Sequence, residues 1–163
     1  MSAVLASERS GARTTRVLVA GVGNVLRGDD GFGPAVTGLL GHLPPEADVI
    51  ETGIGGIALL QELMAGCDGL VLIDALDRGD PPGTVTVIEP DIEEAVHVPD
   101  VHLADPNRVL SMAKTMGFLP DRVVIVGCQP VGMDDLGAGL SPQVRSALPT
   151  AVARIEETVN AWL

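Results

Sequence analysis

The sequence predicts an α/β protein with a five-stranded, mostly parallel sheet that contains one antiparallel strand. Hydrophobic residues make up 46% of the 163 residues, but only two are Phe, one is Trp and none is Tyr. The core must therefore be aliphatic, which suits a parallel sheet buried on both faces. Short strands also alternate with helical stripes in the first half of the chain, and this alternation implies right-handed crossovers between parallel strands.

The first half of the chain contains three expected strands and two expected helices. Each strand is short and leads into a turn, and each helix has apolar residues at spacings of three and four. The strands are expected at 17–20, 48–51 and 70–73. The inward-facing residues are expected to be Phe32, Val36, Leu39 and Leu40 in the first helix and Ile57, Leu60, Leu63 and Met64 in the second.

The connection after the third strand breaks this pattern. Only nine residues separate Asp74 from the run 84–89, which is too few for a helical crossover. The fourth strand is therefore expected to run antiparallel to the third, and its alternation of Thr and Val suits a half-exposed edge. Residues 90–101 are long enough to bring the chain back to the first edge of the sheet.

Two helices and one strand complete the expected fold. A helix at 105–116 and a parallel strand at 122–127 come first. The last helix begins at Ser141, an N-cap residue, with Pro142 at the first helical position. The residues expected to face inward are Val109, Leu110 and Ala113 in the third helix and Val144, Leu148, Val152, Ile155 and Val159 in the last.

Composition and charge exclude several classes of function. The formal charge is −12, with 22 acidic and 10 basic side chains, so the chain repels a phosphate backbone and nucleic acid is not expected as a partner. No apolar run reaches the length of a membrane span or a signal-peptide core. We expect a soluble cytoplasmic protein with a disordered N-terminal tail at 1–15 and a single domain at 16–163.

The two cysteines, Cys67 and Cys128, lie in apolar surroundings without the CxxC or CxxH spacing of a metal site or redox pair. We interpret them as structural thiols rather than as a disulfide, because the cytosol is reducing. Cys128 ends a parallel strand at the edge where sites form, yet its surroundings favour a packed residue over a nucleophile.

A candidate metal site follows from the topology. Asp30 lies in a glycine-rich loop after the first strand, Asp74 ends the third strand, and His102 precedes the third helix. Ligands bind outside the carboxyl ends of parallel strands, so these residues are expected at one edge. Two carboxylates and an imidazole suit Zn²⁺ or Ni²⁺ better than Ca²⁺ or Mg²⁺. The spacing alone leaves open that the aspartates are turn formers or helix caps and that the histidine is a surface residue.

Other chemistries fit the glycine-rich loop poorly. Gly21 and Gly23 follow a strand as in a dinucleotide fingerprint, but Leu26 stands where the third glycine belongs, and no GK[ST] follows. Two carboxylates at the head of a helix would also repel a pyrophosphate. No serine has the GxSxG context of a hydrolase nucleophile. No nucleotide cofactor is therefore expected.

The loop at 21–33, GVGNVLRGDDGFG, resembles the signature GxGNxLxxD(D/E)GxG of the hydrogenase maturation endopeptidases. These proteases trim the C-terminal extension from the large subunit of nickel-iron hydrogenases. The resemblance continues through TGIGG at 52–56, LIDA at 72–75, PGT at 82–84, the lone His102, VGCQP at 126–130 and GLSP at 139–142. Many matches in one order are more specific than any single motif.

The resemblance implies a fold, a partner and a set of site residues. The fold is a three-layer α/β/α sandwich of the phosphorylase/hydrolase-like kind, and the partner is the hydrogenase large-subunit precursor. The metal-binding and catalytic residues are Asp30, Asp74 and His102, and the substrate-binding residues are Asn24, Gly53, Gly55 and Gly56. Many relatives have Ser-x-His followed by Gly-Leu, whereas this chain reads DVHLADP at 100–106, which suggests a different large-subunit partner.

Two mechanisms are compatible with this trio. A resident metal could polarise the scissile carbonyl and lower the pKa of its water. Alternatively, the trio grips nickel already inserted in the substrate, so that cleavage follows nickel loading and an aspartate serves as general base. We favour the second, because the chain has no HExxH motif for a catalytic zinc. The alternative functions are a nickel-binding maturation factor without proteolytic activity and a nucleotide-binding α/β domain.

Overall fold

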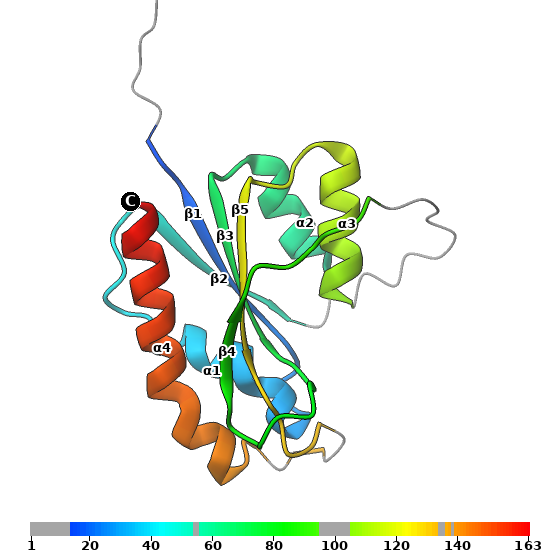
Figure 1. Cartoon of the computed structure of the whole chain (residues 1–163), viewed down its shortest axis with the longest axis vertical. Helices are drawn as coiled ribbons and strands as arrows, with labels where there is room; N and C mark the ends of the chain where they lie inside the picture. The colour runs from blue at the N-terminus through cyan, green and yellow to red at the C-terminus, as the bar shows by residue number, and fades with distance from the viewer. Residues whose placement is uncertain (1–13, 54–55, 95–104, 134–135, 138) are drawn as a thin grey trace, which may run out of the picture.

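The computed structural model describes residues 14–53, 56–94, 105–133, 136–137 and 139–163, which form a sheet between two layers of helices (Figure 1). The strands are β1 Val17–Val22, β2 Ala47–Gly53, β3 Gly69–Ala75, β4 Val85–Ile88 and β5 Arg122–Cys128. Their order in the sheet is β2-β1-β3-β5-β4. Only β4 runs antiparallel to its neighbour, which confirms the predicted mostly parallel sheet with one antiparallel strand.

The helices cover both faces of this sheet. The element that follows β1 is a 3₁₀ turn, η1 Gly28–Gly31, which leads directly into α1 Phe32–Thr37; the others are α2 Gly56–Ala65, α3 Pro106–Met116 and α4 Pro142–Trp162. Helices α1 and α4 lie on one face, and α2 and α3 lie on the other (Figure 1). The predicted three-layer α/β/α sandwich is therefore confirmed.

The core divides into two aliphatic clusters, one on each face of the sheet. In β1, Val17 and Val19 join the cluster under α1 and α4, whereas Leu18 and Ala20 join the cluster under α2 and α3. Successive strand residues point to opposite faces, so every residue of β1 is buried. This is why the central strands read as continuous apolar runs.

The predicted starts of α3 and α4 agree with the structure more closely than the predicted set of buried residues in α2 does. Asp105 caps α3 by accepting from the Asn107 amide at 3.0 Å, and Ser141 caps α4 as predicted. In α2, however, Leu59 and Leu63 are the buried residues, while Ile57 and Met64 are 56% and 50% exposed. The helix has apolar residues on more than one side, so its sequence pattern does not decide which side meets the sheet.

Smaller differences concern the first and last helices. Helix α1 ends at Thr37, so Leu39 lies beyond it and is 52% exposed instead of buried. In α4, Ala147 and Ala151 are buried in place of Leu148 and Val152, which are only half buried. Small side chains allow this helix to approach the sheet closely. Strand β4 has the predicted direction and half-exposed edge position, and it pairs with β5.

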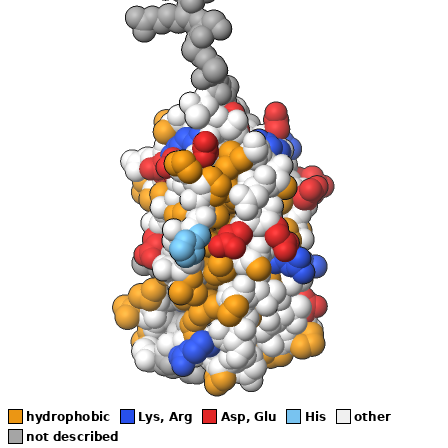
Figure 2. Space-filling view, turned by 90° about the vertical axis from the view of Figure 1, so that its left-hand side faces the viewer, with side chains coloured by type: hydrophobic (Ala, Val, Ile, Leu, Met, Phe, Trp, Pro, Cys, Tyr) orange, Lys and Arg blue, Asp and Glu red, His pale blue; other side chains and the backbone are white. Residues whose placement is uncertain are grey.

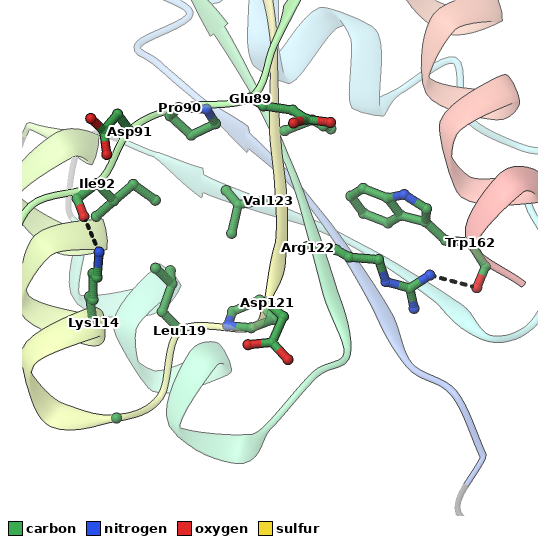
Figure 3. Close-up of a pocket in the computed structure, with 13 residues that line it drawn as sticks. Glu89, Pro90, Asp91, Ile92, Lys114, Leu119, Asp121, Arg122, Val123 and Trp162 are labelled. Atoms are coloured by element: carbon green, nitrogen blue, oxygen red, sulfur yellow. Dashed lines mark hydrogen bonds between the residues drawn. The ribbon is translucent and has the colours of Figure 1, made fainter.

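A hollow of about 710 Å³ lies at the amino end of β5, at the opposite end of the sheet from the carboxyl ends of β1 and β3 (Figure 3). Its lining includes Val123 and Trp162, and the Arg122 guanidinium lies 5.3 Å from the Trp162 ring centroid. Strand β4 pairs with β5 only as far as Ile88 opposite Ile125, so no described strand covers this part of the β5 edge.

The face of the molecule shown in Figure 2 carries acidic side chains in several places, with Lys and Arg side chains scattered between them. Among the residues that the structure describes, no helix has the length and apolar character needed to cross a bilayer.

Candidate functional site

The candidate site lies where the carboxyl ends of β1, β3 and β5 meet. Register pairs Gly21 of β1 with Ile73 of β3, and Asp74 of β3 with Gly127 of β5. The loop after β1 therefore lies beside the ends of the two other strands. This is the edge at which α/β sheets place their ligands.

Two glycines allow the loop after β1 to fold back on the sheet. Gly23 has φ of +134°, and a Cβ there would lie 1.8 Å from the Asp30 carbonyl oxygen. A Cβ on Gly33 would lie 2.2 Å from the Val22 oxygen and 2.7 Å from the Ile73 oxygen. Contacts below 3.0 Å cannot be accommodated by backbone atoms, so both positions require glycine for steric reasons.

Asp29 is the buried anchor of this loop, with only 1% of its surface exposed. Its carboxylate accepts hydrogen bonds from the Val131 and Gly132 amides at 2.8 and 3.3 Å, and from the Ser141 amide and hydroxyl at 2.7 and 3.0 Å. Burial acts to raise the pKa of Asp29, but these hydrogen bonds outweigh it and hold the pKa below its usual value. Asp29 therefore joins the loop to the segment before α4.

Asp30 points the other way, toward the candidate site. Its Oδ2 accepts a hydrogen bond from the Asn24 amide at 2.9 Å, while the Asn24 Oδ1 accepts one from the Leu26 amide at 2.9 Å. Asn24 thus closes the turn that holds Asp30. Its predicted contact with substrate stays a prediction.

Asp74 lies beside Asp30 at the end of β3. Burial is the main cause that raises the pKa of Asp74 to about 7, and the negative charges of Asp30 and Asp105 add to it. The hydrogen bond from the Ala75 amide acts in the opposite direction. The topology therefore brings Asp30 and Asp74 together as predicted, and it leaves a negative charge that a cation would neutralise.

A cleft of about 370 Å³ opens beside Asp30, lined also by Arg27, Asp77 and Gln129. The buried Gln129 fixes one wall, because its Nε2 donates to the Asp77 carboxylate at 2.9 Å. Its Oε1 accepts from the Arg78 amide at 2.7 Å. The hydrogen bond from Gln129 lowers the pKa of Asp77, so the cleft has a second fixed carboxylate.

The other predicted site residues have different outcomes. His102 and Gly55 lie outside the described residues, so the trio with His102 stays a prediction. Gly53 has φ of +60° and its oxygen accepts from the Gly23 amide at 3.3 Å, which places it against the loop that carries Asp30. Gly56 begins α2. Within the described ranges, which exclude 95–104, no three His, Cys, Asp or Glu side chains form a group able to hold a metal.

Both cysteines are free and buried, which confirms that they are structural thiols. Burial, together with the nearby Asp29 charge, raises the pKa of Cys128 to about 11. Its thiol is therefore protonated at neutral pH, whereas a nucleophilic cysteine requires a lowered pKa. The interpretation of Cys128 as a packed residue is supported.

Sequence reasoning missed Asp29, Gln129 and Asp77. A signal for Asp29 existed in the adjacent pair of carboxylates at the head of a helix, because consecutive residues of a helical turn point in different directions and the two cannot both face the cleft. Gln129 and Asp77 lie 52 residues apart in sequence, and no local pattern connects them.

Fold and site together define an α/β/α sandwich with an acidic cleft at the carboxyl edge of its sheet. The sequence model described as hydrogenase maturation protease matches residues 39–158. The chain belongs to this family of endopeptidases.

Individual relatives agree with this assignment. The chain is 33% identical over 153 residues to the hydrogenase expression/formation protein HupD of Rhodobacter capsulatus, covering 90% of this chain and 72% of HupD. It is 32% identical over 155 residues to the hydrogenase expression/formation protein HoxM of Cupriavidus necator, covering 90% of this chain and 75% of HoxM. Among solved structures, the hydrogenase maturating endopeptidase HybD from E. coli is similar with a TM-score of 0.76 and 27% identity, covering 90% of this chain and 93% of HybD.

Proposed function

We propose that this protease removes the C-terminal extension of a nickel-iron hydrogenase large-subunit precursor after nickel has been inserted. The observation that carries the proposal is the pair Asp30 and Asp74: Asp30 lines the cleft, and its negative charge acts on the buried Asp74 beside it. Two neighbouring carboxylates at a sheet edge are suited to bind a cation that arrives with the substrate. In this proposal nickel belongs to the precursor rather than to the protease.

The donor set fits nickel. Carboxylates and an imidazole are ligands that Ni²⁺ accepts, so Asp30, Asp74 and His102 would hold the ion. Nickel held there would act as a Lewis acid on the scissile carbonyl. A precursor without nickel would leave the repulsion between the carboxylates in place and would bind poorly.

Side chains and glycines of the protease itself carry out proton transfer and substrate positioning. One carboxylate oxygen of Asp74, at the end of a central strand, is left to take a proton from the attacking water as general base and to pass it to the amine of the leaving peptide. Asp30 is held in place by the Asn24 amide. The glycines of the turn, Gly53, Gly55 and Gly56, leave room for an extended substrate backbone to approach.

A mobility-shift assay tests the proposal. Nickel-loaded and nickel-free large-subunit precursors are mixed with the wild-type protein, with Asp74→Asn and with Asp121→Asn, an exposed carboxylate at the far end of the sheet. We expect cleavage of the loaded precursor alone, lost in Asp74→Asn and kept in Asp121→Asn. Cleavage of both precursors would reject nickel gating but keep the protease. Nickel-dependent binding without cleavage would favour a nickel-binding maturation factor.

A further inference from the structure

Two loops beside the candidate cleft each bury one polar side chain, Asp29 in one and Gln129 in the other, and expose aliphatic side chains. In the loop after β1, Asp29 is 1% exposed, while Val25 and Leu26 are 61% and 62% exposed. In the loop after β5, Val131 and Leu136 are 55% and 80% exposed. We call these four aliphatic side chains the apolar rim. The hydrophobic effect alone would favour burying these aliphatic side chains rather than the Asp29 carboxylate.

The apolar rim is held in place by hydrogen bonds between the two loops. The Asp29 carboxylate accepts from the Val131 amide, and the Asp29 amide donates to the Gly132 oxygen at 3.0 Å. The Gly137 amide donates to the Leu26 oxygen at 2.9 Å, beside a β-bridge between Arg27 and Leu136. The exposure of the aliphatic side chains is therefore a consequence of defined contacts.

The apolar rim borders the cleft. Val131 lines it together with Arg27 and Asp30, and the bridge to Arg27 places Leu136 next to the same wall. Val25 lines a neighbouring hollow of about 270 Å³ with Pro34 and Leu140. Exposed aliphatic side chains gathered around a polar cleft mark an interaction surface.

We infer that the apolar rim binds an apolar stretch of the hydrogenase large-subunit precursor that lies next to the bond to be cut. This inference rests on the proposed function and adds the surface that selects the substrate. A second copy of the chain is a poorer occupant, because each copy has a formal charge of −12. Pairing two rims would also bring the carboxylates of both clefts close together.

Steady-state cleavage of the nickel-loaded precursor tests the inference with Leu26→Ser, Leu136→Ser and the double variant. We expect KM to rise about tenfold for each single change and about a hundredfold for the double variant, from the loss of one buried aliphatic contact each. The value of kcat should stay within about twofold of wild type, because the bound substrate and the transition state lose the same contact. Leu39→Ser is the matched control, because Leu39 is 52% exposed but lies outside both loops.

Three outcomes separate the possibilities. If the wild type cleaves and the double variant has an unchanged KM, the docking surface is wrong and the proposed function stands. If the wild type cleaves no loaded precursor, the proposed function fails and the inference fails with it. If sedimentation shows a wild-type dimer that the double variant loses without a change in KM, the occupant is a second copy. A KM close to the wild-type value for Leu136→Met, together with a melting temperature of Leu136→Ser that equals that of wild type, would support the inference.

Discussion

Replacing Asp74 with Asn should stabilise the folded protein, and more so at higher pH. The pKa of Asp74 is about 7 in the folded chain against a usual value of 3.8. The folded state therefore holds this proton more tightly than the unfolded state. The stability contributed by the carboxyl group is present below about pH 4 and is lost as the pH rises toward about 7, since the unfolded state binds fewer protons in that window.

The size of the effect follows from the same two pKa values. Linkage predicts that ionisation of Asp74 lowers the free energy of unfolding by about 2 kcal/mol more at pH 8.0 than at pH 5.5. For a chain of this length, that corresponds to a melting temperature difference of roughly 4–8 °C. Asn keeps the shape of the side chain but cannot ionise, so the variant should lack this dependence.

Urea unfolding of wild type, Asp74→Asn and Asp121→Asn at pH 5.5 and 8.0 measures the effect. Asp121→Asn controls for the change in net charge at an exposed position. The pKa of Asp29 is held low, so Asp29 does not titrate in this window. The reasoning is refuted if the stability difference between Asp74→Asn and wild type is the same at both pH values.

Three further predictions concern the loops of the site. Asp29→Ala should destabilise the fold by about 3 kcal/mol, because it removes the acceptor of the Ser141 and Val131 amides. Urea unfolding measures this, and a loss below about 0.5 kcal/mol would contradict the anchoring role. Gly23→Ala should abolish cleavage while Gly41→Ala, where a Cβ meets open space, retains it; equal activities would show that the loop can relax. Cys128 should resist iodoacetamide at pH 7.5 in the folded protein, because its pKa is raised, and rapid alkylation detected by mass spectrometry would disprove this.

Much of the fold could be predicted because it depends on local patterns. The apolar runs of β1 and β3 and the short connection after Asp74 determine a mostly parallel sheet with one reversed strand. The same topology predicts that Asp30 and Asp74 share an edge, since both follow parallel strands. These conclusions require only strand direction and chain length.

The rest depends on contacts that local patterns do not encode. The buried side of α2 is chosen by the sheet beneath it, so Leu59 and not Ile57 faces inward. Asp29 finds its partners 102 to 112 residues further along the chain. Its role therefore becomes visible only when the loops after β1 and β5 are placed side by side.

The open half of the β5 edge has a consequence for how the protein avoids aggregation. Pro90 lacks a backbone N–H and follows β4 at the point where the ladder to β5 would otherwise continue. Unpaired sheet edges attract strands from other molecules. Charged side chains of both signs surround this edge, namely Glu89, Asp91, Lys114, Asp121 and Arg122 (Figure 3). An incoming strand would have to remove water from them. The short strand β4 therefore leaves part of the β5 edge unpaired, but Pro90 and these charged side chains make that part a poor template for the strands of other molecules.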